Sequence, residues 1–298
     1  MSLSKKILAA AATLPLIAAL AGCAGSSSDA EKGTADNPVK LGVVGASDPY
    51  WEIYKKAAAD EGISVDIVDF TEYPQPNPAL TEGEIDLNQF QHIVYLAQYN
   101  EASGEDLVPV GATAIYPLAL YSTKYTSVKD IKKGDTVAIP NDESNLSRAL
   151  LVLQSAGLVK LKDGGSSLST VDDVDTDKST VKVTTLEASL TPTSLPDVAA
   201  AIINNDFVAD AGLTFDDAIA QDDPSDPNAL PYVNIFAARA EDKDNETFKK
   251  LVSIYQDTKT VTDAVQENSG GTAVFVKTPV TDLQSSLDTV EADIKAKG

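Results

Sequence analysis

The chain has 298 residues, of which 43% are apolar, and its formal net charge is -22. This apolar content is that of a globular protein, and so acidic a surface argues against nucleic acid as a partner, because nucleic acid is also negatively charged. His92 is the only histidine, which excludes a zinc or copper site built from several imidazoles, and we expect neither a metal nor a cofactor.

The N-terminus carries the pattern of a lipoprotein signal peptide. Lys5 and Lys6 precede an apolar stretch at 7–21, and the run Leu-Ala-Gly ends at Cys23, the only cysteine. A cysteine in this place resembles the bacterial lipobox, in which the thiol is acylated and becomes the first mature residue. The alternatives are a cysteine without a role and a transmembrane helix, but the apolar stretch is shorter than the roughly 20 residues a spanning helix needs. We therefore expect cleavage of residues 1–22 and a protein held by lipidated Cys23 on the extracytoplasmic face of the cell membrane.

Residues 23–38 are small, polar and acidic without periodicity, which predicts a flexible tether. From Val39 onward, strand-like and helix-like segments alternate, which implies a largely parallel sheet covered on both faces. We expect strands at 39–44, 64–70, 107–121, 136–140, 181–186 and 232–238, and helices at 50–61, 88–101, 145–156 and from 246 onward.

The length of the chain suggests two α/β lobes. The apolar segments 112–121 and 230–236 are the places where the chain could cross between them. We therefore expect lobe 1 to comprise residues 39–114 and 232–298, and lobe 2 to comprise residues 115–231. A ligand cleft between the lobes is then the default binding site.

The sharpest local feature is the run PNDESNLSRAL at 140–150, which leads from a strand into a helix. The free N–H groups and positive dipole end of a helix attract anions. Asn145 and Arg148 lie three residues apart on one face of the first turn, and an arginine fork matches a carboxylate better than the lysines this chain otherwise prefers. The alternative is a surface arginine that pairs with Asp142 or Glu143.

Four further places offer binding groups, each with a plainer alternative. Tyr73 stands in a proline-rich turn that would fix its ring, or it packs on its own lobe. Phe90 and His92 enter a predicted helix, where a lone histidine is often only a buried hydrogen-bonding group. Tyr116 presents its ring to the cleft or packs in a core. Asn204 and Asn205 follow an apolar run as ligand donors or as part of an ordinary turn.

Signatures of enzymes are sparse. The chain contains no nucleophile elbow, no P-loop and no dinucleotide-binding fingerprint. Acylation of Cys23 excludes a Cys-His site, and a Ser-His-Asp site would depend entirely on His92. Carboxylate pairs remain available among 45 acidic residues, so a secreted, lipid-anchored hydrolase is the alternative to a binding protein.

Taken in order, the runs TEYPQPNPAL, GEIDLNQFQH, VGATAIYPLALYS, VAIPNDESNLSRALLVLQSAGLVKLKDG, INNDFVADAGL and PYVNIFAAR resemble the NlpA family of lipoproteins. The resemblance implies a two-lobed periplasmic-binding-protein fold of type II and no enzymatic activity. It implies the function of a D/L-methionine-binding component, which delivers its ligand to an ABC permease and has the cytoplasmic ATPase as an indirect partner through that permease.

The resemblance also implies roles for the candidate residues. Arg148 and Asn145 match the positions that hold the ligand carboxylate, and Asn204 matches an asparagine that helps to hold the polar end. The aromatic positions around the ligand side chain match Tyr73, Phe90, His92 and Tyr116. Thr193 stands where many relatives carry arginine, and Ala114 stands where some carry a larger residue. The choice among L-methionine, D-methionine, a related amino acid and a short peptide stays open at this point.

Overall fold

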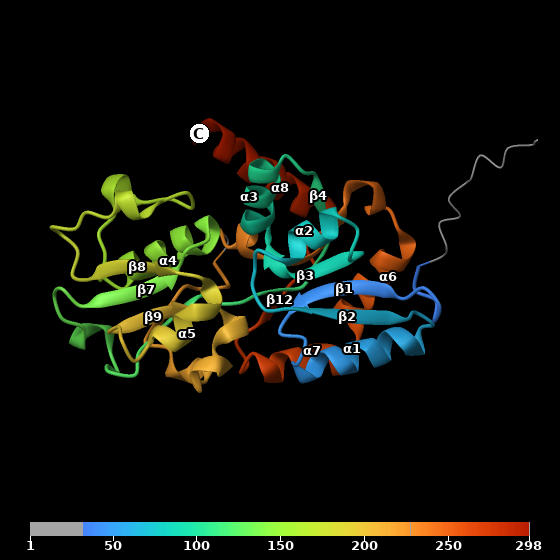
Figure 1. The fold of residues 1–298 in the computed structure, drawn as a ribbon, viewed down its shortest axis with the longest axis horizontal. Coiled ribbons are helices and arrows are strands. Elements are labelled where there is room, and N and C mark those ends of the chain that lie inside the picture. The colour runs from blue at the N-terminus through green and yellow to red at the C-terminus, as the bar shows by residue number, and fades with distance from the viewer. Residues whose placement is uncertain (1–31, 227, 298) are drawn as a thin grey trace, which may run out of the picture. The chain divides into compact units, whose positions relative to one another are not determined.

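Two mixed five-stranded sheets organise the computed structural model, which describes residues 32–226 and 228–297. Cys23 and the predicted signal peptide lie outside the described residues. Within those ranges, no helix is both long and apolar enough to cross a membrane. We call the body around the first sheet lobe 1 and the body around the second sheet lobe 2 (Figure 1).

The sheet of lobe 1 has parallel and antiparallel parts. Its strand order is β2 (Val65–Phe70), β1 (Val39–Val44), β3 (Leu87–His92), β11 (Asn234–Arg239), β4 (Leu107–Ala112). Strand β1 runs parallel to β2 and β3, whereas β11 runs antiparallel to β3 and β4. The sheet is therefore mixed: β2, β1, β3 and β4 run in one direction, as the prediction of a largely parallel sheet requires, and β11 is inserted in the opposite direction where the chain re-enters lobe 1.

Helices cover both faces of this sheet, as Figure 1 shows. One layer consists of α1 (Pro49–Asp60), α6 (Glu246–Asp257) and α7 (Lys259–Asn268), and the other of α2 (Pro76–Thr81), α3 (Ile93–Ser103) and α8 (Val280–Lys297). Trp51 and Tyr54 of α1 pack with Phe236 in the first layer, and Leu96 of α3 packs with Leu283 in the second. The sheet lies between two apolar clusters, which fixes the strand register.

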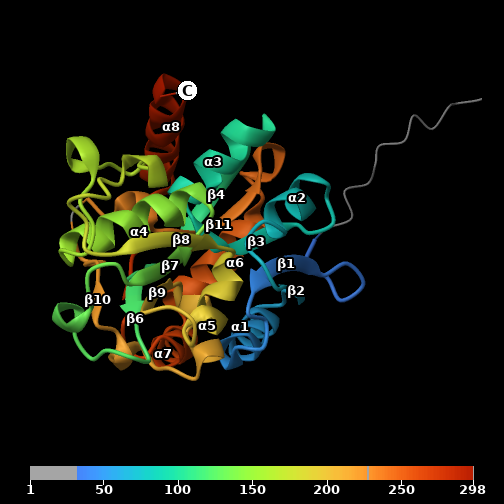
Figure 2. The same cartoon turned by 60° about the vertical axis from the view of Figure 1, so that its left-hand side comes forward.

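The sheet of lobe 2 follows the same plan with shorter strands. Its order is β10 (Ala220–Gln221), β6 (Ala119–Tyr121), β9 (Ala200–Ile203), β7 (Thr136–Pro140), β8 (Lys182–Leu186). Helices α4 (Glu143–Ser155) and α5 (Thr191–Ser194) lie on opposite sides of the sheet in the turned view of Figure 2. Alternation along β7 explains this, because Val137 and Ile139 join the cluster under α4 and Ala138 joins the opposite one.

Two segments connect the sheets. The first crossing segment, residues 113–118, follows β4 and contains the short strand β5 (Ala114–Ile115), which pairs with β12 (Val274–Phe275). The second crossing segment, residues 222–233, leads from β10 to β11. The predicted single strand at 107–121 is therefore wrong. It is divided into three strands because the chain leaves one sheet and enters another.

The predicted helix at 88–101 is correct only in its second part. Residues 87–92 form β3, and all six are buried between β1 and β11. Helix α3 starts afterwards, at Ile93. The polar run Asn-Gln-Phe-Gln-His has no strand-like alternation, and its pairing with strands distant in sequence decides its conformation.

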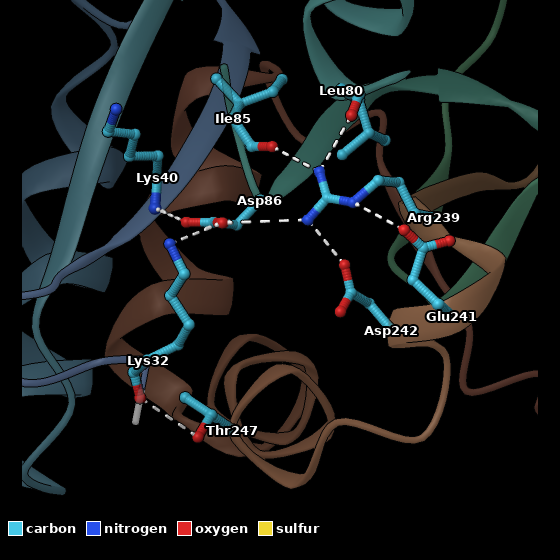
Figure 3. Close-up of polar contacts among 9 residues, drawn as sticks. All are labelled: Lys32, Lys40, Leu80, Ile85, Asp86, Arg239, Glu241, Asp242 and Thr247. Atoms are coloured by element: carbon cyan, nitrogen blue, oxygen red, sulfur yellow. Dashed lines mark hydrogen bonds and ion pairs between the residues drawn. The ribbon is translucent and has the colours of Figure 1, made fainter. Parts of the chain in front are cut away.

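A polar network joins the start of the described chain to lobe 1 (Figure 3). Asp86 is 4% exposed, and its carboxylate contacts Lys32 Nζ at 2.9 Å and accepts from Lys40 N at 2.9 Å. Arg239 Nη2 lies 4.0 Å from Asp86 and 2.6 Å from Asp242, while Nη1 donates to one carbonyl within α2 and to one in the connection between α2 and β3. Residues 32–38, which we expected to belong to the tether, thus contain Lys32 bound to the body.

Removal of the central carboxylate tests this network. Asp86→Ala leaves Lys32 without its partner and the part-buried backbone N–H of Lys40 without its side-chain acceptor, so we expect the free energy of unfolding to fall by about 2–4 kcal/mol. Urea denaturation of the purified protein measures the change. Lys250→Ala is the control, because its ion pair with Glu61 is about half exposed and should contribute about 1 kcal/mol or less. A loss for Asp86→Ala no larger than that of the control would contradict the network.

Candidate ligand-binding site

One cavity between the two sheets is lined by every residue that the sequence nominated for binding. Lobe 1 supplies residues from β3 and from the connection after β2, and lobe 2 supplies residues from α4 and from the end of β9. The nominated residues on its wall are Tyr73, Phe90, His92, Tyr116, Asn145, Arg148 and Asn204. Asn205, which the sequence nominated beside Asn204, also lies on the wall, as do Gln91, Tyr95 and Asn234, which the sequence did not single out.

The first turn of α4 is organised by its N-cap. Asp142 Oδ1 accepts from the backbone N–H of Asn145 at 2.9 Å and from Ser144 Oγ at 2.9 Å. Asp142 also accepts from Asn145 Nδ2 at 3.0 Å, so the amide of Asn145 has a fixed orientation. Oδ1 of Asn145 in turn accepts from Asn204 Nδ2 at 2.9 Å. The cap thereby connects α4 to the end of β9.

Arg148 is buried, with 6% of its surface exposed. Its Nε donates to Asp222 Oδ2 at 2.6 Å, its Nη2 donates to the Tyr116 carbonyl at 2.8 Å, and its Cζ lies 4.5 Å from the centre of the Tyr232 ring. A surface pair with Asp142 or Glu143, the sequence alternative, is therefore wrong. Because a guanidinium has five N–H groups, three remain after these two bonds, on Nη1 and Nη2, and they suit an end-on contact with a carboxylate.

His92 is neutral and has a defined tautomer. Its Nδ1 accepts from Tyr95 N at 3.2 Å as the N-cap of α3, so the ring proton is on Nε2. Burial, together with the nearby charge of Arg148, lowers the pKa of His92 to about 3. The Asn145 amide is close enough to affect this pKa, yet Nε2 completes no hydrogen bond with any described residue.

A second polar atom at the cavity is also without a partner. Asn204 Oδ1 is buried and accepts no hydrogen bond from the described part of the chain, although its Nδ2 is bonded. Buried polar atoms in proteins are almost always paired. The cavity therefore offers one free donor, His92 Nε2–H, and one free acceptor, Asn204 Oδ1, beside the free N–H groups of Arg148. This set matches a small ligand with both an anionic and a cationic end.

Aromatic rings form the other wall. The Tyr73 ring centre lies 5.9 Å from Phe90 and 5.1 Å from Phe207, and Phe90 lies 5.6 Å from Tyr95. Tyr73 also links the lobes directly, because it follows β2 of lobe 1 and its hydroxyl donates to Asp206 Oδ2 of lobe 2 at 2.8 Å. The turn that carries Tyr73 thus contributes an apolar surface and an interlobe bond.

A second cavity of about 290 Å³ adjoins the first and shares Phe90, Tyr116, Asn205 and Asn234 with it. It is acidic, and its carboxylates are those of Asp48, Asp206, Asp216 and Glu267. Burial raises the pKa of Asp206 to about 7, against the lowering effect of the Tyr73 hydrogen bond. Burial likewise raises the pKa of Asp48 to about 6. Within the described ranges, no group of three His, Cys, Asp or Glu residues is arranged to hold a metal ion.

The residues that the sequence missed come from long-range contacts. Asn234 of β11 pairs with His92 of β3, and Tyr232 reaches Arg148 from the second crossing segment. Gln91 and Tyr95 flank the nominated His92, and that proximity was the one available signal. Asp222, which binds Arg148, stands in a run of acidic residues with no local feature that distinguishes it.

Comparisons with known proteins agree with one another. A sequence model described as NlpA lipoprotein matches residues 39–276. The D-methionine-binding lipoprotein MetQ of Yersinia pestis is 43% identical over 280 residues, which are 92% of this chain and 99% of that protein. Among solved structures, a nutrient-binding protein of Burkholderia cenocepacia bound to methionine is 38% identical, with a TM-score of 0.74 over 80% of this chain and 99% of its own. A periplasmic substrate-binding protein of an ABC transporter from Coxiella burnetii is 35% identical, with a TM-score of 0.74 over 80% and 100%. The predicted two-lobed α/β fold is confirmed.

The raised pKa of Asp206 predicts a pH dependence of stability. The folded protein takes up a proton at Asp206 near pH 7, whereas the unfolded chain does so only near the usual value of 3.8. Asp206 therefore favours folding increasingly as the pH falls from 8 to 5. We expect the free energy of unfolding of wild type, measured by urea denaturation, to rise relative to that of Asp206→Asn as the pH falls from 8 to 5.

His92 opposes this trend below its usual pKa of 6.5, but both proteins contain it, so its share cancels in the difference. Asp197→Asn, a change at an exposed carboxylate, is the control and should give a flat difference. A flat difference for Asp206→Asn as well would contradict the assignment.

Proposed function

The chain belongs to the NlpA lipoprotein family, and we propose that the cavity between its lobes binds methionine through Tyr73, Phe90, His92, Tyr116, Asn145, Arg148 and Asn204. The protein is a methionine-binding, substrate-binding lipoprotein of an ABC transporter, anchored on the extracytoplasmic side of a membrane. It is a transport component and not an enzyme, so the hydrolase alternative is set aside.

The observation that carries the proposed site is the set of free polar groups at the cavity. The ligand carboxylate accepts from the remaining N–H groups of Arg148 and from His92 Nε2–H. The ligand ammonium donates to Asn204 Oδ1. A neutral histidine suits this arrangement, because it donates a hydrogen bond without adding a second buried positive charge beside Arg148.

The aromatic wall supports the assignment of the ligand side chain. A thioether is polarizable and gains about 0.3–1.5 kcal/mol from each contact with an aromatic ring. The rings of Tyr73, Phe90 and Tyr116 surround the region next to the polar groups. This cavity has a volume of only about 20 Å³, so we expect the side chain of methionine to extend past these rings toward the adjoining cavity of about 290 Å³, which shares Phe90 and Tyr116.

The remaining parts of the chain follow from this function. We propose that Cys23 is acylated after removal of residues 1–22 and that the membrane is reached through this lipid. The permease is the membrane partner, and the cytoplasmic ATPase is an indirect partner through this permease. The lobes, comprising residues 39–114 with 232–298 and residues 115–231, close on the ligand by bending at the crossing segments.

Arg148→Ala tests the site. The variant removes one partner of a buried charge pair with the ligand carboxylate, so we expect methionine to bind about thirtyfold to several thousandfold more weakly. Isothermal titration of the purified mature protein with L-methionine and with D-methionine measures the loss.

Arg239→Ala is the matched control, because it removes the other arginine of the sequence and lies in the network around Asp86. It should lower stability and leave the affinity for methionine within about twofold. If Arg148→Ala also binds within twofold of wild type, the carboxylate site lies elsewhere.

The anchor is tested separately with Cys23→Ser. Without the thiol there is no acceptor for the lipid, so we expect the variant to appear as unprocessed precursor or as protein released from the membrane. Fractionation and mass spectrometry of the N-terminal peptide distinguish the two. A cleaved variant that still partitions with membranes would show that the anchor is not at Cys23.

A further inference from the structure

Asp222 uses both of its carboxylate oxygens next to the binding site without lining the cavity. Oδ2 accepts from Arg148 Nε at 2.6 Å, and Oδ1 accepts from the backbone N–H of Leu118 at 2.8 Å. The backbone N–H of Asp222 donates in return to the Leu118 carbonyl at 3.2 Å. Asp222 is the first residue of the second crossing segment, and Leu118 is the last residue of the first.

These bonds leave Arg148 little freedom. Its Nε is held by Asp222, its Nη2 by the carbonyl of Tyr116, and its plane by the Tyr232 ring. Tyr116 and Tyr232 belong to the two crossing segments, so the guanidinium is fixed on both of them. An arginine has many rotamers, and a binding group that is already held in place loses less freedom when its ligand arrives.

We propose that Asp222 is a positioning residue for carboxylate recognition: it holds the Arg148 guanidinium against both crossing segments so that its Nη edge faces the cavity. This proposal rests on the proposed function, because it requires that the ligand carboxylate meets Arg148. Asp222 itself does not touch the ligand.

Two effects of removing the charge of Asp222 oppose each other. An unneutralised Arg148 would attract a carboxylate more strongly, but a displaced Arg148 would meet it in the wrong geometry. The side chain of Asp222 is 27% exposed, so water already screens part of its charge, whereas that of Arg148 is 7% exposed and its Nε–H would be left without an acceptor. Loss of position therefore outweighs the gain in attraction.

The test uses the purified mature protein and three variants. Asp222→Asn keeps an acceptor for Leu118 N–H but removes the carboxylate from Arg148. Asp222→Glu keeps the charge and shifts it by one methylene. Asp223→Asn is the matched control, because the neighbouring carboxylate is exposed and bonds only to Ser225 among the described residues.

We expect Asp222→Asn to bind L-methionine about five- to fiftyfold more weakly in isothermal titration, and Asp222→Glu to show a smaller loss. The control should remain within twofold. In protein labelled with ¹⁵N-arginine and free of ligand, the Arg148 Nε–H signal should exchange with solvent much faster in both Asp222 variants and be unchanged in the control.

Two results would overturn the proposal. One is an affinity of Asp222→Asn within twofold of wild type, or tighter. The other is a loss of affinity while the Arg148 Nε–H signal stays as protected as in wild type, because the role would then be general stability. If Asp222→Asn does not fold, Asp222→Glu decides on the same two measurements. Failure of the proposed function looks different, because wild type itself would then not bind methionine.

Discussion

The structure depends on how one buried cation is accommodated. A guanidinium removed from water is strongly destabilising unless its charge and its N–H groups are matched. Arg148 obtains these partners from three places distant in sequence: the Tyr116 carbonyl, the Asp222 carboxylate and the face of Tyr232. The same contacts fix α4 against both segments that connect the lobes. The residue best suited to bind an anion is thus also the residue that contacts both crossing segments.

Apart from Arg148, the free hydrogen-bonding groups of the cavity belong to uncharged side chains. His92 contributes a donor while staying neutral, and Asn204 contributes an acceptor while its amide nitrogen is tied to Asn145. His92 is oriented by the N-terminus of α3, and Asn145, which binds the Asn204 amide, is oriented by the N-terminus of α4. Fixed dipoles of this kind recognise a zwitterion without the desolvation of further ions. The carboxylates line the neighbouring cavity instead, and among them those of Asp48 and Asp206 have raised pKa values.

The sequence was informative where local pattern and structure coincide. Strands β1 and β7 have the predicted bounds, and α1 and α4 differ from prediction by one or two residues, because apolar runs, a proline start and an Asp N-cap act locally. The nominated cavity residues were found because each lies within a family motif. Strand β3 was mistaken for a helix because its polar residues are buried by partners from elsewhere in the chain. Asp222 and Tyr232 escaped notice for the same reason, since their importance arises from Arg148, which lies more than seventy residues earlier.

The attachment of Lys32 to Asp86 has a mechanical consequence. The chain enters the folded body through a clamp that belongs wholly to lobe 1, with Lys32 Nζ on Asp86 and the Lys32 carbonyl accepting from Thr247 of α6. A pull transmitted from the N-terminus would therefore act first on the sheet of lobe 1, whose strand β3 follows Asp86 and also supplies Phe90 and His92 to the cavity. The contacts of Lys32 described above are with lobe 1, so tension at the N-terminus would reach the cavity through that lobe.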